Sequence, residues 1–286
     1  MMKTNRLVGP LMLLAGIGMA GCATTDGPDT LPAHDNADAV VWMQTSAEYA
    51  AVTTSIYAAA REALEKIAEA EPGRTRQMAI VLDVDETVLD NGRYQGQLVL
   101  DDSGYDSETW DDWIALRTAS AVPGVVEFIG TAQALGFHVA FITNRSCRAR
   151  PNTPDNCPQL QDTESNLQSV GIDTASTTLF LRGDGPTDRC RSFLSAAERV
   201  EGKWSSDKTS RRACIVLDYD IVMLFGDQLG DFAEIGDSQQ GVSGRDIAAT
   251  YPDRWGKTWF MLPNPTYGSW RPRDPAKKRD LIRGIN

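Results

Sequence analysis

Histidine is scarce in this chain of 286 residues, in which His34 and His138 are the only two. This scarcity disfavours sites that need several imidazole ligands, such as most zinc centres. Basic residues are also few, since 28 lysines and arginines stand against 39 aspartates and glutamates and the formal net charge is −11. Nucleic-acid backbones and anionic lipid surfaces would repel so acidic a body. The composition therefore argues against a nucleic acid polymer as a partner.

Long apolar runs are confined to the N-terminus, and without a later run of about 18 apolar residues we expect no further transmembrane helix. Lys3 and Arg6 precede the apolar stretch LVGPLMLLAGIGMAG, which ends at Cys22. Small residues directly before a cysteine resemble the bacterial lipobox, so we expect residues 1–21 to be a signal peptide and Cys22 to be lipidated. Ala23, by the same resemblance, indicates an outer-membrane lipoprotein of the cell envelope, facing either the periplasm or the surface.

Cleavage before Cys22 would remove two basic residues and change the formal net charge from −11 to −13. Residues 22–36 are polar, contain glycine and proline, and are typical of a tether. The membrane is thus expected to be reached through the lipid anchor alone. Residues 37–286 are then left to form one domain.

Four cysteines follow Cys22, and an even number in an exported chain indicates two disulfides. Cys147 and Cys157 are ten residues apart across a proline-rich loop, so we expect them to pair, which leaves Cys190 with Cys214. A zinc site is the alternative, but neither the spacing nor the histidine count favours it.

Strand-like and helical patterns alternate after an alanine-rich segment at about 37–70 that reads as one or two amphipathic helices. Helices are expected at 125–135, 161–171 and 206–218, and strands at 78–83, 137–143, 177–182, 221–227 and 257–262. These strands are continuously apolar, as strands covered on both faces of a parallel sheet are. The chain is therefore predicted to be an α/β protein with a parallel sheet flanked by helices.

Acidic and polar residues stand where three of these strands end. Asp83 ends the first strand and Asp85 lies just beyond it. Thr143 ends the second strand, before Asn144 and Arg145, and Asp227 ends the fourth, four residues before Asp231. The carboxyl ends of parallel strands meet at one edge of the sheet, where ligands bind. Carboxylates gathered there would repel one another unless a cation neutralised them, and oxygen ligands favour Mg²⁺. A solvated turn or a calcium loop is the alternative for the first acidic segment alone.

This set resembles the haloacid dehalogenase superfamily, through DVDETVLDN, ITNR, SDKTSRR and FGDQLGDF. More closely, it is similar to the class C nonspecific acid phosphatases, bacterial lipoproteins that act as acid phosphatases or 5′-nucleotidases. The segments WMQTSAEYAAVTTSIYAAA, WDDW, AVPGVVEF and GKTWFMLPNPTYGSW carry this closer resemblance across nearly all of the expected mature chain.

The resemblance implies a role for each matching residue. Asp83 would be the nucleophile that forms an aspartyl-phosphate, and Asp85 the general acid and then the base. Thr143, Asn144 and Lys208 would bind phosphate, while Asp83, Asp85 (through its main-chain carbonyl), Asp227 and Asp231 would hold Mg²⁺. Trp110 and Tyr267 match aromatic positions that stack on a nucleobase or aryl group, and core packing is the alternative for each. A small cap insertion at about 91–120 would carry Trp110.

Two departures from the family pattern affect these assignments. An insertion near 186–204 precedes the lysine motif, and Arg182 is consequently an alternative phosphate-binding cation. The loop between Cys147 and Cys157 follows the ITNR motif directly and is expected to shape the mouth of the site.

These observations predict a magnesium-dependent phosphomonoesterase that acts on small nucleotide or aryl phosphates. The alternatives are a phosphomutase or phosphonate hydrolase, a phosphate-accepting receiver-like switch, and a non-catalytic ligand-binding or adhesive lipoprotein of the same fold. The sequence leaves open the physiological substrate and the oligomeric state.

Overall fold

The computed structural model describes residues 34–70, 75–151, 153–233, 244–272 and 277–285. All of them lie in a compact unit that spans Pro32–Asn286. The expected signal peptide, Cys22 and most of the expected tether lie outside the described residues. Within the described ranges, no helix has both the length and the hydropathy that crossing a bilayer requires.

A five-stranded parallel sheet forms the centre of the unit, with the strand order β5-β4-β1-β6-β7. Its strands are β1 (Met78–Leu82), β4 (His138–Ser146), β5 (Thr178–Arg182), β6 (Asp220–Gly226) and β7 (Trp259–Met261). The α/β prediction is confirmed. β1 is the middle strand, so residues that follow it lie between the ends of two neighbours.

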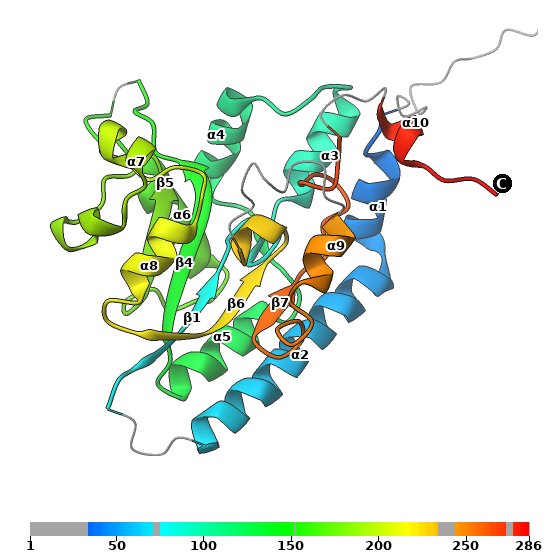
Figure 1. Cartoon of the computed structure of the whole chain (residues 1–286). Coiled ribbons are helices and arrows are strands. Elements are labelled where there is room, and N and C mark those ends of the chain that lie inside the picture. Colours follow the sequence, from blue (N-terminus) through cyan, green and yellow to red (C-terminus); the bar gives the residue numbers. More distant parts are fainter. Residues whose placement is uncertain (1–33, 71–74, 152, 234–243, 273–276, 286) are drawn as a thin grey trace, which may run out of the picture. The chain divides into compact units, whose positions relative to one another are not determined.

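Helices cover one face of the sheet (Figure 1) and share a large apolar core with it. They are α2 (Ala47–Ala70), α5 (Val125–Ala134) and α6 (Pro158–Ser169), while α1 (Ala37–Thr45) contacts α2 and α3 (Gly92–Leu100). Tyr57 and Leu64 of α2 are fully buried against Phe128 of α5 and Phe225 of β6. The alanine-rich helix α2 is thus part of the core rather than an appendage.

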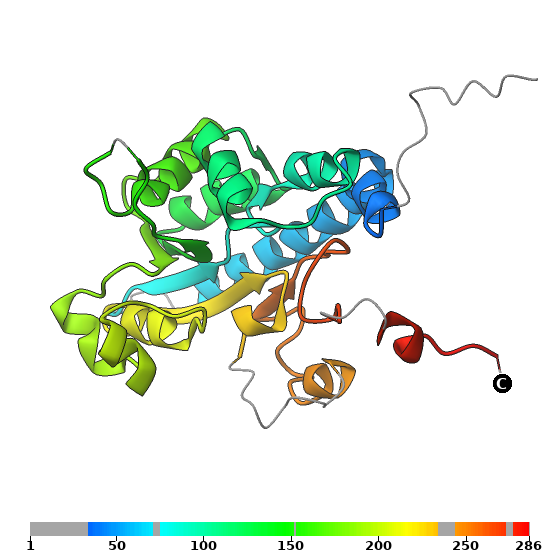
Figure 2. The ribbon, with the colours of Figure 1, turned by 90° about the horizontal axis from the view of Figure 1, so that it is seen from above.

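The opposite face is covered more thinly. Ala79 and Val81 point to this side while Ile80 and Leu82 point to the other, as the two-residue period of a strand requires. The covering elements on this side are α8 (Thr209–Ile215) and the short 3₁₀ helix η2 (Leu229–Asp231), and the chain continues through α9 (Gly244–Ala249) to β7. The view from above shows α8 and α9 on the side away from α2 (Figure 2).

The α8 helix is shorter than the expected helix at 206–218. Leu217, Asp218 and Tyr219 donate backbone hydrogen bonds to Cys214 and Ile215 and form a turn. The chain must reverse there because β6 begins at Asp220.

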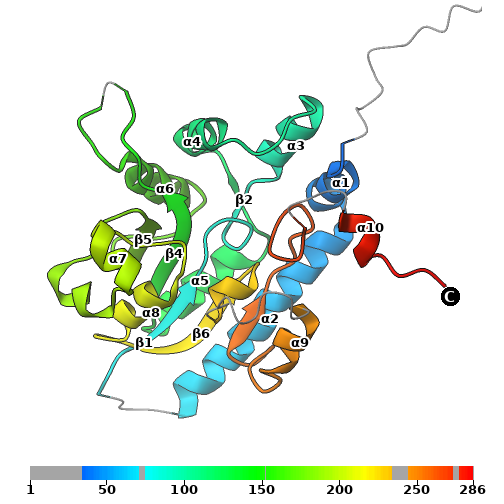
Figure 3. The same cartoon turned by 45° about the horizontal axis from the view of Figure 1, so that its top comes forward.

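Segment 91–120 contains two helices, α3 (Gly92–Leu100) and α4 (Ser107–Leu116). A short antiparallel pair, β2 (Leu89–Asp90) with β3 (Ser120–Ala121), joins the segment to the sheet domain. Figure 3 shows α3 beside α1 and α4 beside α6, on the side of the sheet where β2 leaves β1. We call this segment the cap.

Both expected disulfides are present, Cys147–Cys157 and Cys190–Cys214. The second joins Cys190, in the 3₁₀ helix η1 (Asp188–Phe193) of the insertion, to Cys214 in α8. The insertion also contains α7 (Ala196–Glu201). The insertion is more than a surface excursion, since Cys190, Leu194 and Trp204 form a small buried cluster with Cys214. The last helix is α10 (Lys278–Leu281).

Candidate active site

The ends of the three central strands bring the predicted acids together. Asp83 directly follows β1, and its backbone N–H still pairs with the carbonyl of Phe225 in β6 at 3.0 Å. Asp227 directly follows β6, and Thr143 lies on the neighbouring β4. Because all three strands are parallel, these side chains share one edge of the sheet.

Three carboxylates form the centre of this edge. Oxygen atoms of Asp83, Asp227 and Asp231 all lie within 4.8 Å of one another. Asp231 approaches closely because residue 226 is glycine: a Cβ there would lie 2.2 Å from the Cβ of Asp231. The amide of Asn264 donates to Asp227 at 2.7 Å.

Lys208, at the N-cap of α8, is the cation nearest to this cluster. Its ammonium donates to Asp231 at 2.5 Å and also to Asp83, and its side chain is buried. Burial raises the pKa of Asp83 to about 7 against the opposing effect of Lys208. Burial, together with Asp231 and Asp83, also raises the pKa of Asp227 well above its ordinary value. One ammonium thus faces three carboxylates, of which Asp83 and Asp231 are buried and Asp227 is half-buried, and cannot neutralise all of their negative charge.

Burial opposes the charge of Lys208, but Asp231 and Asp83 outweigh it and raise the pKa of the ammonium. Lys208 therefore stays protonated beside Asp83 and Asp231.

The donor set suits a hard divalent cation. It contains oxygen ligands alone, without histidine or cysteine, and oxygen ligands of this type favour Mg²⁺ over softer metals. The side chain of Asp85 is outside this group, and its predicted contribution through the main-chain carbonyl stays a prediction.

Asp85 is instead oriented by Arg145. The guanidinium contacts both carboxylate oxygens of Asp85, at 2.7 and 3.0 Å to Oδ1 and 3.2 Å to Oδ2. Asn91 donates to Oδ1 at 3.0 Å and the hydroxyl of Thr143 to Oδ2 at 3.3 Å. Arg145 belongs to the ITNR motif, and its contact with Asp85 was not predicted from the sequence. Its place directly after two polar strand-end residues was a usable signal.

Asn144 lies at the same strand end but bonds to the lysine loop. Its side chain accepts from Arg211 at 2.7 Å and donates to the carbonyl of Ser206 at 3.0 Å. Arg211 also donates to the carbonyl of Thr143 at 2.6 Å. Asn144 and the buried Arg211 therefore fix the loop that carries Lys208. Arg182, the alternative cation, is exposed at the end of β5.

A cavity of about 920 Å³ opens over these groups. Asp83, Asp85 and Lys208 line its floor, and Trp110 and Tyr267, both predicted to stack on substrate, line its walls. The structure thus brings the predicted acids, the lysine and both aromatic residues to one place.

Tyr267 is held by a residue that sequence reasoning did not single out. Its hydroxyl donates to Glu86, which is fully buried and has a φ of 57°, in the left-handed region. Glu86 also accepts the backbone N–H of Asn91 at 3.0 Å. The acidic turn after β1 therefore connects the segment that carries Asp83 to the aromatic wall of the cavity.

Both ends of the described unit reach the rim of the cavity. Lys278 forms an ion pair with Asp35, and Arg271 donates to Asn36 at 2.5 Å and to the carbonyl of Thr266 at 2.8 Å. His34 and Asp35 line the cavity together with Arg271 and Lys278.

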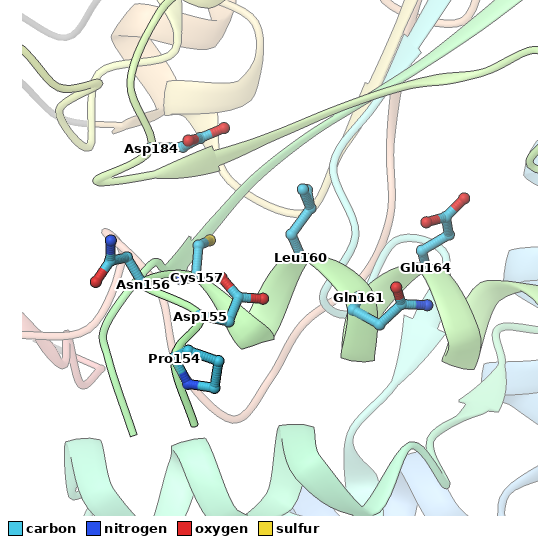
Figure 4. A pocket seen from close by; sticks show the side chains of 8 residues that line it. All are labelled: Pro154, Asp155, Asn156, Cys157, Leu160, Gln161, Glu164 and Asp184. Carbon is cyan, nitrogen blue, oxygen red and sulfur yellow. Dashed lines mark hydrogen bonds between the residues drawn. The ribbon is translucent and has the colours of Figure 1, made fainter. Parts of the chain in front are cut away.

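A second hollow, of about 510 Å³, lies beside the Cys147–Cys157 loop and α6 (Figure 4). Its charged lining residues are Asp155, Glu164 and Asp184, without a basic one. Such a surface repels phosphate, so the large cavity is the candidate site.

A family model decides the family of this chain. The model for the HAD superfamily, subfamily IIIB (Acid phosphatase), matches residues 28–270. The chain belongs to this family of acid phosphatases. It is a hydrolase of phosphoric monoesters with an α/β fold of the HAD type.

Solved structures agree with this assignment. Two structures of the class C acid phosphatase from Bacillus anthracis, one of them with tungstate bound, are 27% identical to this acid phosphatase. Each match covers 87% of this chain and 97% of that one, with TM-scores of 0.66 and 0.65. The resemblance to the class C enzymes is thereby confirmed, and small phosphoesters are the substrates that the family acts on.

Proposed function

We propose that this acid phosphatase is a magnesium-dependent phosphomonoesterase that works through an aspartyl-phosphate on Asp83. The observation that carries the proposal is the clustering of Asp83, Asp227 and Asp231 at the strand ends, with Asp85 two residues after the proposed nucleophile. Asp83, Asp227 and Asp231, together with the Asp85 main-chain carbonyl, would hold the ion. When bound, Mg²⁺ supplies positive charge that offsets the repulsion between the carboxylates and phosphate oxygens.

The residues of the site divide the reaction between them. A carboxylate oxygen of Asp83 forms a bond to phosphorus while the ester P–O bond breaks. Asp85, which Arg145 holds beside the same crevice, gives its proton to the departing oxygen. Lys208 and Thr143 bind the non-bridging phosphoryl oxygens.

The second half of the reaction restores the enzyme. Asp85 takes a proton from water, and the water oxygen attacks the phosphorus of the aspartyl-phosphate. The bond between Asp83 and phosphorus breaks, inorganic phosphate leaves, and both carboxyl groups return to their starting states.

Trp110 and Tyr267 support a preference for leaving groups with a planar ring. Both line the cavity above the acids, and Trp110 is only half-buried, so part of its ring is free for contact. A ring stacked on an aromatic side chain gains roughly 1–3 kcal/mol, largely independent of which base it is. Nucleoside 5′-monophosphates and aryl phosphates fit this chemistry.

The Asp83→Asn variant tests the mechanism. It should fold normally, as judged by circular dichroism, and release no phosphate from p-nitrophenyl phosphate. Near-normal turnover would remove Asp83 as the nucleophile. Activity of the wild-type protein should also disappear with a chelator and return with added Mg²⁺, and activity that persists in the chelator would exclude the metal requirement.

We also propose that the enzyme is an outer-membrane lipoprotein of the cell envelope. The proposal rests on the motif that ends at Cys22 and on the two disulfides, which form in oxidising compartments. Cys22→Ser should abolish incorporation of labelled fatty acid and release the enzyme from membranes. Membrane retention of that variant would refute anchoring through Cys22.

A further inference from the structure

The loop closed by Cys147–Cys157 is hydrogen-bonded to the cap helix α4. Arg150 in this loop donates from Nε to Oδ2 of Asp111 at 2.7 Å and from Nη2 to Oδ1 at 2.8 Å. Arg148 adds a bond to the carbonyl of Ser107, the first residue of α4, at 2.9 Å. The planar guanidinium of Arg150 thus forms a two-point contact, which fixes orientation as well as distance.

The same contact is anchored to the sheet domain. The remaining nitrogen of Arg150 donates to Asp162 of α6 at 2.5 Å, and Asp162 is nearly fully buried. Gln159, also buried on α6, donates to Asp111 at 2.7 Å and to the carbonyl of Arg148 at 2.9 Å. The cap helix, the disulfide loop and α6 therefore meet in one hydrogen-bonded network.

The helix that this network holds carries Trp110 next to Asp111. Successive residues of a helix point about 100° apart, so Asp111 faces α6 and the loop while Trp110 faces the cavity. The Trp110 ring packs edge-on against Tyr94, with 5.0 Å between ring centroids, and lies 5.8 Å from the guanidinium carbon of Arg145. Arg145 in turn binds Asp85. Any rotation of α4 would therefore move the aromatic wall relative to the acids.

We propose that Arg150, within its disulfide-closed loop, is a positioning residue that sets the selectivity of the enzyme for phosphomonoesters with a planar ring in the leaving group. The inference rests on the proposed function, because it assigns Trp110 to contact with that ring. Arg150 bonds to Asp111 and Asp162 and not to Asp83, Asp85 or Lys208, so its loss should weaken ring binding and leave the phosphoryl chemistry intact. Lysine at position 150 would keep the charge but lose the two-point contact.

Adenosine 5′-monophosphate and ribose 5-phosphate form a matched substrate pair, since they share the phosphate, the ester oxygen and the sugar and differ in the base. We expect Arg150→Lys to raise KM for adenosine 5′-monophosphate by about tenfold, as partial loss of a stacking contact would. KM for ribose 5-phosphate and kcat for both substrates should stay within about twofold. The double variant Cys147→Ser/Cys157→Ser, which opens the loop, should show the same selective loss.

Arg189→Lys is the matched control. Arg189 makes a comparable two-point contact with Asp218, at 2.7 and 3.1 Å, in the insertion rather than at the cap. This variant should keep both KM values. Thermal unfolding of each variant establishes that it is folded at the assay temperature. If Arg150→Lys does not fold, the KM values of the double serine variant test the inference.

Equal rises in KM for both substrates would overturn the inference, because they would mark a purely structural role. Unchanged KM values in folded Arg150→Lys and in the loop variant would overturn it as well. A wild-type enzyme without any preference for the nucleotide would remove the aromatic contact from the proposed function, and one that releases no phosphate would remove the proposed reaction itself. These failures are distinguishable because the last two are read from the wild-type protein alone.

Discussion

Glu198 provides the sharpest energetic test of the structure. This buried carboxylate of α7 accepts four hydrogen bonds: from the backbone N–H of Ser195 at 2.8 Å, from the N–H and hydroxyl of Ser205 at 2.9 Å each, and from the hydroxyl of Ser210 at 2.7 Å. Ser205 and Ser210 flank Lys208, so the insertion stabilises the loop that carries Lys208. Glutamine at this position would retain one acceptor oxygen and direct its amide at donors.

The magnitude follows from the pKa of Glu198. Burial raises it, but the hydrogen bonds from Ser205, Ser210 and Ser195 outweigh burial and lower the pKa from 4.5 to about 2. A depressed carboxyl pKa stabilises the folded state above the unfolded pKa, and this stabilisation is lost as the pH falls towards the folded pKa. A shift of this size contributes at most about 3 kcal/mol at pH 7 and about 1.4 kcal/mol at pH 3.

Urea unfolding followed by far-UV circular dichroism should therefore show Glu198→Gln to be less stable by about 2 to 3 kcal/mol at pH 7. The difference from wild type should shrink as the pH falls from 4.5 to 3. Glu201→Gln, in the same helix but exposed, is the control and should change stability by less than about 0.5 kcal/mol. A destabilisation by Glu198→Gln that is small at pH 7, or equal at pH 7 and pH 3, would refute the reasoning.

Three further predictions concern the metal, the strand end and the core. Saturating Mg²⁺, at about a hundred times its Kd, should add about 2.7 kcal/mol to the free energy of unfolding and raise Tm by roughly 5 to 10 °C. The rise should be smaller in Asp227→Asn, and equal rises by calorimetry would contradict Asp227 as a ligand. Gly226→Ala should abolish phosphate release because its Cβ would displace Asp231, whereas Gly230→Ala meets no atom within 4 Å and should remain active; an active Gly226→Ala enzyme would contradict the close approach. Leu64→Ala should cost about 2–5 kcal/mol in urea unfolding, because this side chain is fully buried in the core, and a cost below about 1 kcal/mol would mean that α2 does not pack as described.

The sheet and the acids were predictable because each depends on a local pattern. Continuously apolar segments such as Met78–Leu82 predict buried parallel strands, and the topology of such strands brings Asp83, Thr143 and Asp227 to one edge. The spacing of the cysteines across a short proline-rich loop sufficed to pair Cys147 with Cys157.

Contacts between segments far apart in the chain could not be predicted from the sequence. The bond between Tyr267 and Glu86 joins residues 181 positions apart, and Glu86 adopts a left-handed φ that is uncommon for a residue other than glycine. Arg150 and Asp111 are 39 positions apart, and many other acids were available as partners. The end of α8 was also hidden, because Val216 and Leu217 continue an apolar pattern where the chain must turn towards β6.

Because Asp35 and Lys278 pair at the rim of the cavity, a purification tag at either end of the chain could change the measured kinetics. A recombinant protein that replaces the first 33 residues with an affinity tag would place foreign sequence immediately before His34, which lines the substrate entrance. Extensions beyond Asn286 would begin only a few residues after α10, which carries the other half of the pair. Michaelis constants should therefore be compared between tagged and protease-trimmed enzyme before any substrate preference is assigned to the protein itself.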